Sequence, residues 1–167
     1  MSQFSHYNED GLPKMVDISS KSATSRTATA ECRVRISNHL YEAIHEQSLK
    51  KGNPLPVAQV AGIMAAKKTA EWIPMCHPIL IQGTDLSFKY EPVKDGYMLV
   101  IGATVTVDGN TGVEMEALTA VTAAALTFYD MCKAVDKSMV IEETLLVKKT
   151  GGKNGDFYHP RRREKMD

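Results

Sequence analysis

Residues 27–36 read TATAECRVRI and alternate strictly between two kinds of side chain. Alanine, Cys32, Val34 and Ile36 share one face, whereas threonine, glutamate and arginine share the other. A period of two is typical of a β-strand that buries one face and exposes the other. The segment therefore predicts a half-buried strand, around which the other elements can be arranged.

Two helices are predicted after this strand. Ser37 is suited to cap a helix that ends at Gly52, and Pro54 and Pro56 stand where the first turn of a helix tolerates proline. Residues 72–78, WIPMCHP, are predicted to be irregular, because each proline restricts the residue that precedes it.

Hydrophobic patterning predicts three further strands and one long helix. The strands span about residues 80–90, 97–107 and 139–148, and the helix spans about 111–134. The order β-α-α-β-β-α-β is the split βαβ pattern of ferredoxin-like folds with one added helix. We therefore expect an α+β fold in which helices cover one face of an antiparallel sheet. Residues 97–101 are apolar on both faces, which favours a second subunit over the open face.

Length and composition predict one domain. The chain has 167 residues, of which 43% are apolar and 24% charged, as is ordinary for a globular protein. We expect a single domain over residues 1–167, with a mobile N-terminal arm (about 1–14) and a mobile C-terminal tail (about 154–167) that carries the arginines 161–163.

Charge, hydropathy and cysteine usage exclude several classes of protein. Lys+Arg and Asp+Glu both number 20, so no overall basic field is available to bind nucleic acid. The first residues lack the apolar core of a signal peptide, and the longest nearly apolar stretch, 56–66, is shorter than the about 20 residues of a transmembrane helix. Three cysteines without a CxxC pair argue against a disulfide framework and a zinc site. We expect a cytoplasmic protein that binds neither nucleic acid nor membrane.

The start of the long helix, residues 111–116 (TGVEME), holds two acidic side chains. Thr111 and Glu114 have the spacing of a capping box, which is a purely structural role. Glu116 is not needed for such a cap and is the better candidate for a functional residue.

Asp130 and Lys133 lie near the end of the same helix at a spacing of three. They are either a solvated ion pair or, because apolar residues flank Asp130, an acid and a base with mutually perturbed pKa values. Glu116 and Asp130 are fourteen residues apart, which is about 21 Å along a helix axis. If both serve one small substrate, a second copy of the chain must complete the site.

His77 stands between Cys76 and Pro78 in a rigid segment. A lone histidine is most often structural, but the flanking prolines also suit a side chain that points into a pocket. No partner cluster accompanies Cys76 and His77, so we expect no metal. Lys148 and Lys149 alternate faces at a strand end, so at most one of them points toward a site beside the glycine loop 151–155 (GGKNG), whose backbone could approach phosphate.

Taken together, these segments resemble the molybdenum cofactor biosynthesis protein C family. The resemblance runs from Met15 to Lys153, and its most specific stretches are 60–69 (VAGIMAAKKT), 73–78 (IPMCHP), 111–119 (TGVEMEALT) and 129–134 (YDMCKA). It implies a single catalytic domain with lyase activity on 3′,8-cyclo-7,8-dihydroguanosine triphosphate. The rings are rearranged into a pterin, a cyclic phosphate forms and pyrophosphate leaves. It also implies a homohexamer built as a trimer of dimers, with interfacial active sites and with no metal or other cofactor.

The resemblance also assigns roles to individual residues. It implies that Asp130 is the catalytic carboxylate, that Lys133 is its acid–base partner and that Lys149 acts on the leaving group. Asn53 stands where the family usually has aspartate. The implied substrate-contacting residues are Met75, Cys76, His77, Met115, Glu116, Lys51 and Glu114.

Two other classes of function remain open from the residues alone. One is a non-catalytic nucleotide-binding module whose lysines only hold phosphates. The other is a structural oligomer in which Asp130, Lys133 and Glu116 form ion pairs between subunits. An acid–base pair favours the enzyme, because a binding module needs the lysines but has no use for Asp130.

Overall fold

The computed structural model describes residues 5–153 and 155–161. Within this part of the chain the strands form one antiparallel sheet of five, in the order β2-β3-β1-β4-β5. The first four have the order of a ferredoxin-like fold, so the predicted α+β class is confirmed. The strands are β1 (Thr24–Ile36), β2 (Gly83–Val93), β3 (Gly96–Gly109), β4 (Val140–Thr150) and β5 (Phe157–Tyr158).

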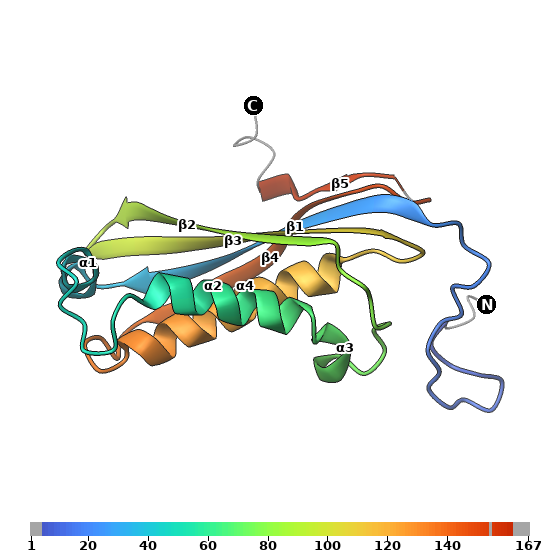
Figure 1. Cartoon of the computed structure of the whole chain (residues 1–167), viewed down its shortest axis with the longest axis horizontal. Helices are drawn as coiled ribbons and strands as arrows, with labels where there is room; N and C mark the ends of the chain where they lie inside the picture. Colours follow the sequence, from blue (N-terminus) through green and yellow to red (C-terminus); the bar gives the residue numbers. More distant parts are fainter. Residues whose placement is uncertain (1–4, 154, 162–167) are drawn as a thin grey trace.

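Helices cover one face of this sheet. Figure 1 shows α2 and α4 beneath the sheet, with α1 at one end and α3 toward the other. The predicted layers are therefore confirmed, although the short α3 and strand β5 had no sequence signal strong enough to predict them. The helices are α1 (Asn38–His45), α2 (Pro54–Ala66), α3 (Thr69–Trp72) and α4 (Glu114–Cys132).

Strand β1 is central, because it pairs with β3 on one side and with β4 on the other. The apolar residues of its alternating pattern, from Ala28 to Ile36, are buried against the helices, as predicted. The other face carries Arg33, which forms ion pairs with Glu31 at 3.1 Å and with Glu91 at 2.6 Å. The open face of the sheet is therefore more polar than the apolar residues 97–101 of β3 alone had indicated.

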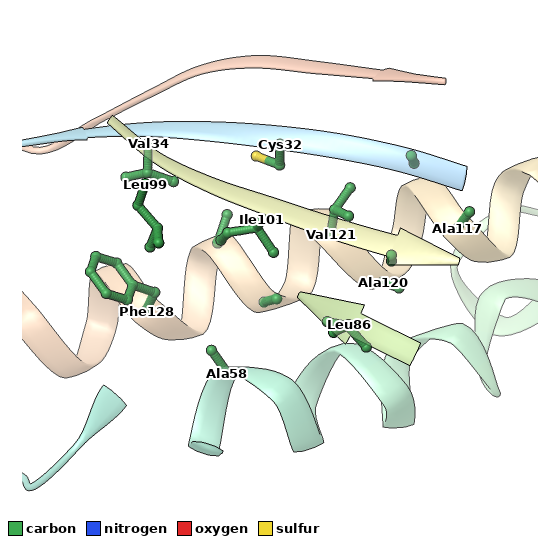
Figure 2. Packing of buried hydrophobic residues seen from close by; sticks show 14 of the residues in the cluster. Cys32, Val34, Ala58, Leu86, Leu99, Ile101, Ala117, Ala120, Val121 and Phe128 are labelled. Atoms are coloured by element: carbon green, nitrogen blue, oxygen red, sulfur yellow. The ribbon is translucent and has the colours of Figure 1, made fainter. Parts of the chain in front are cut away.

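Small residues of α4 pack against the sheet and complete the core. Ala117, Ala120 and Val121 lie under the sheet, whereas Phe128 fills the wider space near the end of the helix (Figure 2). On its other side α4 meets α2, where a Cβ atom at Gly62 would lie 2.9 Å from the carbonyl oxygen of Ala120. Because α2 and α4 approach so closely, neither helix can shift without opening the core.

Helix α1 is shorter than predicted, and the expected end at Gly52 is wrong. The helix ends at His45, and Gln47 adopts a positive φ of 54°. The Ser48 amide donates to the Ala43 carbonyl at 3.0 Å, and the Gln47 amide donates to the Ile44 carbonyl at 3.2 Å. These two bonds form a Schellman motif, so the chain leaves the helix five residues before the glycine.

The capping-box interpretation of Thr111 and Glu114 is also wrong. Helix α4 begins at Glu114, and its N-cap residue, Val113, offers no side-chain hydrogen bond. The Glu114 carboxylate instead accepts a hydrogen bond from Lys149 of β4 at 2.7 Å. A long-range charged partner therefore outcompetes the local cap, and it turns Glu114 toward the end of β4.

We predict that Gly62→Ala destabilises the protein by about 1–3 kcal/mol, because the new methyl group meets backbone atoms of α4 that cannot yield. The loss should exceed the gain in helix propensity that replacing glycine normally brings, about 1 kcal/mol. Urea unfolding followed by circular dichroism measures the change. Gln59→Ala, at an exposed position on the same helix, is the control; an equal or higher stability of Gly62→Ala would contradict the close approach.

Candidate active site

The predicted site residues form separate groups near the two ends of α4. Asp130 and Lys133 lie at the C-terminal end, and Glu114, Met115 and Glu116 lie at the N-terminal end. Since both ends belong to one continuous helix, the two groups are about 21 Å apart along its axis. Within one chain the structure does not bring them together.

The first group, the acid–base cluster, consists of Asp130, Lys133 and Lys51. Lys133 Nζ lies 2.7 Å from Asp130 Oδ1, and Lys51 Nζ lies 3.1 Å from Asp130 Oδ2. Lys51 also donates to the Asp130 carbonyl oxygen at 2.9 Å and so caps the end of the helix. Two ammonium groups thus hold one carboxylate from both sides.

These contacts set the charge of the acid–base cluster. Hydrogen bonds from Lys133 and then from Lys51 lower the pKa of Asp130, and the bond to Asp130 raises the pKa of Lys133. The carboxylate is therefore a stable anion and the Lys133 ammonium a stable cation. The Asp130 side chain is 57% exposed, so the apolar setting expected from its sequence neighbours is wrong. Helical periodicity turns Phe128 inward and Asp130 outward.

The second group lines a cavity of about 570 Å³, here called the histidine pocket. This volume lies within the range of about 300–1,000 Å³ that is usual for small-molecule sites. Its walls come from the irregular segment before β2, from the start of α4 and from the N-terminal arm. The predicted residues that line it are Met75, Cys76, His77, Glu114, Met115 and Glu116.

His77 is held by the backbone of the segment that precedes β1. Its Nε2 atom lies 2.7 Å from the carbonyl oxygen of Val16. Because a carbonyl oxygen only accepts, Nε2 carries the proton of this hydrogen bond. The side chain thus has both a structural contact and a place in the wall of the cavity.

Glu116 is the buried acid of the histidine pocket, with only 3% of its surface exposed. Burial first, and then repulsion from Glu114, raises the pKa of Glu116 to about 7. Burial and the nearby Glu116 also raise the pKa of Cys76, so its thiol stays protonated at neutral pH. A carboxyl that titrates near neutrality can give or take a proton, whereas Cys76 is not set up as a nucleophile.

Lys149 lies in a smaller cavity beside the histidine pocket, here called the glycine-loop pocket. Residues Ala28 and Lys149 are paired in the sheet, so Lys149 faces the helix layer and Lys148 faces away. The prediction that at most one of the two lysines faces the candidate site is therefore confirmed. Lys149 Nζ lies 2.7 Å from Glu114 Oε1, which joins the end of β4 to the start of α4.

The geometry of one chain thus offers an ionised acid–base pair at one end of α4 and a cavity with a titratable carboxyl at the other. The sequence profile of the MoaC family matches residues 15–152. The chain belongs to the MoaC family. The match covers both groups of residues and leaves out only the two termini.

Named relatives of this chain are highly similar to it over nearly their full length. A cyclic pyranopterin monophosphate synthase of Shouchella clausii is 98% identical over 167 residues, which is 100% of each chain. A protein of the same name in Lysinibacillus sphaericus is 65% identical over 95% of this chain and 99% of its own length. Another, in Halalkalibacterium halodurans, is 57% identical over 94% of this chain and 95% of its own length.

The departure from the MoaC pattern at Asn53 has a clear structural account. Asn53 is the N-cap of α2, and its Oδ1 accepts a hydrogen bond from the Leu55 amide at 3.1 Å. Asparagine and aspartate cap helices about equally well, so the change leaves the start of α2 intact.

Sequence reasoning missed several residues that line the two cavities. Among them, Val16, Ile18 and Lys21, from the segment between the predicted arm and β1, reach the histidine pocket, and Lys21 and Arg26 reach the glycine-loop pocket. This segment shows no periodicity, so the sequence predicts no element there. Its inclusion in the stretch that resembles the MoaC family was the only signal that it contributes to the site.

Two further observations concern metal ions and membranes. Across residues 5–153 and 155–161, no three His, Cys, Asp or Glu side chains are placed to hold a metal ion together. In the same residues no helix has both the length and the apolar character needed to cross a bilayer. That the reaction needs no metal stays a prediction.

Of the three arginines in the expected C-terminal tail, Arg162 and Arg163 lie outside the described residues.

We predict that Glu116→Gln stabilises the protein at pH 8 and much less at pH 5. The folded state raises the pKa of this carboxyl, so the folded protein holds the proton more tightly than the unfolded chain does. Stability is therefore lost as the pH rises from the unfolded value through about 7, and glutamine removes that loss. The gain at pH 8 should be about 1–3 kcal/mol.

Thermal unfolding of both proteins at pH 5 and pH 8 measures this difference. Glu71→Gln is the matched control, because the Glu71 side chain is 67% exposed on α3. A pH-independent difference between Glu116→Gln and the unmodified protein would show that Glu116 is not desolvated.

Proposed function

We propose that this chain carries out its reaction at a site shared between two subunits, with Asp130, Lys133 and Lys51 from one and the two pockets from the other. The reaction is that of a cyclic pyranopterin monophosphate synthase, a lyase of molybdenum cofactor biosynthesis. Its substrate is the small molecule 3′,8-cyclo-7,8-dihydroguanosine triphosphate, which is converted to cyclic pyranopterin monophosphate with release of pyrophosphate.

The reaction needs proton transfer and charge stabilisation. Opening and reclosing the guanine-derived rings moves protons between nitrogen and carbon, which is work for a general acid and a general base. Forming the cyclic phosphate joins a hydroxyl oxygen to the α-phosphorus while the bond from that phosphorus to the bridging oxygen breaks. The hydroxyl loses its proton, and the electron pair of the broken bond leaves with pyrophosphate, so cationic side chains must stabilise the departing charge.

The described side chains match these needs. The ionised Asp130 can accept a proton and the Lys133 ammonium can donate one. Glu116, with a pKa raised to about 7, is a second group able to do either. Lys149 lies beside Glu114 and can hold or protonate the leaving group. We propose that His77, Met75, Cys76 and Met115 contact the ring system, because they line the larger cavity.

The length of α4 is the observation that carries the shared site. A two-fold axis perpendicular to α2 and α4 reverses both helices in the partner. It therefore moves the acid–base cluster of one subunit toward the histidine pocket of the other. Helix α2 offers a surface for this contact, because Val57, Val60 and Met64 are between 45% and 57% exposed on it. Such a patch of large apolar residues on a helix is typical of an interface.

The proposal extends to the full assembly and its location. We propose a hexamer built as a trimer of such dimers. The open face of the sheet is then available for the contacts that join one dimer to the next. Each subunit is a single catalytic domain, works without a metal or another cofactor, and acts in the cytoplasm.

We predict that Asp130→Asn lowers kcat by about 10²–10⁴-fold without loss of assembly or of substrate binding. The assay mixes pure protein with the cyclic dihydroguanosine triphosphate and follows pyrophosphate release and the cyclic-phosphate pterin. Unchanged turnover would mean that Asp130 is not catalytic. Tight binding by the unmodified chain without any product would favour the non-catalytic nucleotide-binding module.

We further predict that two inactive variants regain activity when their subunits form mixed dimers. If Asp130→Asn and Lys149→Met subunits are co-expressed in equal amounts, half of the dimers are mixed, and each has one intact site. Activity should therefore return to about a quarter of the unmodified level.

The matched control combines Asp130→Asn with Lys133→Met, because both changes lie in the same half of the site. No mixed dimer of that pair has an intact site, so activity should stay near zero. Equal activity of the two mixtures would show that the site does not extend between subunits.

A further inference from the structure

We propose that Asp136 is a positioning residue, which holds the start of α1 against the turn after α4 and thereby keeps Lys51 in place beside Asp130. This inference rests on the proposed function, because it concerns the acid–base cluster of that site. Asp136 is not among the site residues that the sequence predicted, and it lines neither the histidine pocket nor the glycine-loop pocket.

Asp136 is a buried carboxylate, with 6% of its surface exposed. Burial alone would raise the pKa of Asp136, but hydrogen bonds from Ser138 and Ser37 outweigh it and lower the pKa. The group is therefore ionised at neutral pH. Hydrogen bonds to an ionised acceptor are shorter and stronger than those between neutral groups, so the atoms that donate to Asp136 are firmly held.

The two oxygens of this carboxylate serve different parts of the chain. Oδ1 accepts from the amide of Ser138 at 2.8 Å and from its hydroxyl at 2.6 Å, which shapes the turn after α4. Oδ2 accepts from the amide of Ser37, 99 residues earlier, at 3.0 Å. Ser37 is the N-cap of α1, and the Asp136 amide donates to the Cys132 carbonyl of α4 at 3.1 Å. One residue thus joins the end of α4 to the start of α1.

Helix α1 depends on this contact because little else holds its direction. Only Leu40 and Ala43 of its eight residues are buried. Figure 1 shows α1 at the same end of the molecule as the C-terminal end of α4. The ring of Tyr41 stacks on that of Tyr97 in β3, with the ring centroids 3.6 Å apart. A stacked pair has no single directional bond, so α1 can still turn about this contact unless its start is fixed.

The direction of α1 sets the position of Lys51. The Ser48 amide donates to the Ala43 carbonyl and the Gly52 amide to the Leu49 carbonyl, both at 3.0 Å, so the following loop is folded onto the end of the helix. Lys51 belongs to this loop. Eight helical residues span about 12 Å, and a tilt of about 5° at one end therefore moves the other by about 1 Å. A misplacement of about 1 Å can lower a rate about a hundredfold.

The first test is a comparison of kcat and KM for the precursor. Asp136→Ala should lower kcat about tenfold to a hundredfold, because Lys51 no longer holds Asp130 in its active position. KM should change little, since both pockets lie at the other end of α4. Asp136→Asn should lie between the two proteins, because its single carbonyl oxygen can accept from Ser37 or from Ser138 but not from both.

Ser138→Ala is the matched control. It removes the 2.6 Å hydrogen bond to the same carboxylate but leaves the contact with α1, so kcat should stay near the unmodified level. Thermal unfolding of every variant defines an assay temperature at which all of them are folded. If Asp136→Ala does not fold, Asp136→Asn takes its place in each comparison with Ser138→Ala.

A double variant tests whether Asp136 acts through Lys51. When Asp136→Ala is added to Lys51→Met, the residual single-turnover rate should fall no further, because the ammonium that Asp136 positions is already absent. Effects that multiply would mean that Asp136 acts by another route.

Lysine labelling gives a readout that needs no turnover. The full chain is treated with an amine-acetylating reagent, and mass spectrometry of its peptides follows the labelling of Lys51. The rate should rise severalfold in Asp136→Ala, because the Lys51 ammonium is no longer held by the Asp130 carboxylate and carbonyl. Lys89, with 75% of its side chain exposed on the open face of the sheet, is the internal reference and should not change.

Four results would each overturn the inference. These are an equal kcat in Asp136→Ala and Ser138→Ala, a loss that lies in KM instead of kcat, a further loss in the Lys51→Met background, and unchanged labelling of Lys51. Failure of the proposed function looks different: the unmodified chain would yield no pterin from the precursor, while the labelling of Lys51 would still respond to Asp136→Ala.

Discussion

The close packing of α4 between the sheet and α2 is the constraint on which the rest of the structure depends. Five of its ten buried residues are alanine, and Gly62 lets the backbone of α2 approach it, so α4 can lie deep in the molecule. A helix held so tightly acts as a rigid rod. It fixes the acid–base cluster at one end and the histidine pocket at the other, too far apart for one small substrate. The proposal of a site shared between two subunits rests on this rigidity.

The two ends of α4 also differ in their electrostatics. At the exposed end, two lysines lower the pKa of Asp130 and keep it ionised. At the buried end, desolvation raises the pKa of Glu116 to about 7, so that it holds a proton over much of the acid range. One helix therefore presents two carboxyl groups with opposite proton preferences, and their surroundings, not their residue type, decide the difference. Chemistry that moves protons in both directions can use such a pair.

Most of the fold could be predicted from local patterns. The alternation in residues 27–36, the prolines that start α2 and the alanine-rich helix each agree with the structure. Two local predictions are wrong for different reasons. Helix α1 ends in a local backbone motif at Gln47, a residue type that sequence patterns do not associate with a positive φ as strongly as glycine. Glu114 is drawn away from a cap by Lys149, 35 residues along the chain, which the residues around Glu114 do not reveal. Strand β5 was missed because two residues carry no period.

The sequence by itself determined the long elements, their order, the family and the types of residue available for acid–base chemistry, because these depend on short-range spacing and on long matching segments. Only the tertiary structure decided which of those residues meet. It placed His77 on the backbone of the segment that precedes β1, turned Lys149 rather than Lys148 toward α4, and gathered Arg26 and Lys21 with the glycine loop. These contacts join residues far apart in the chain, and their geometry arises from the pairing of strands and the packing of helices, which no local pattern encodes.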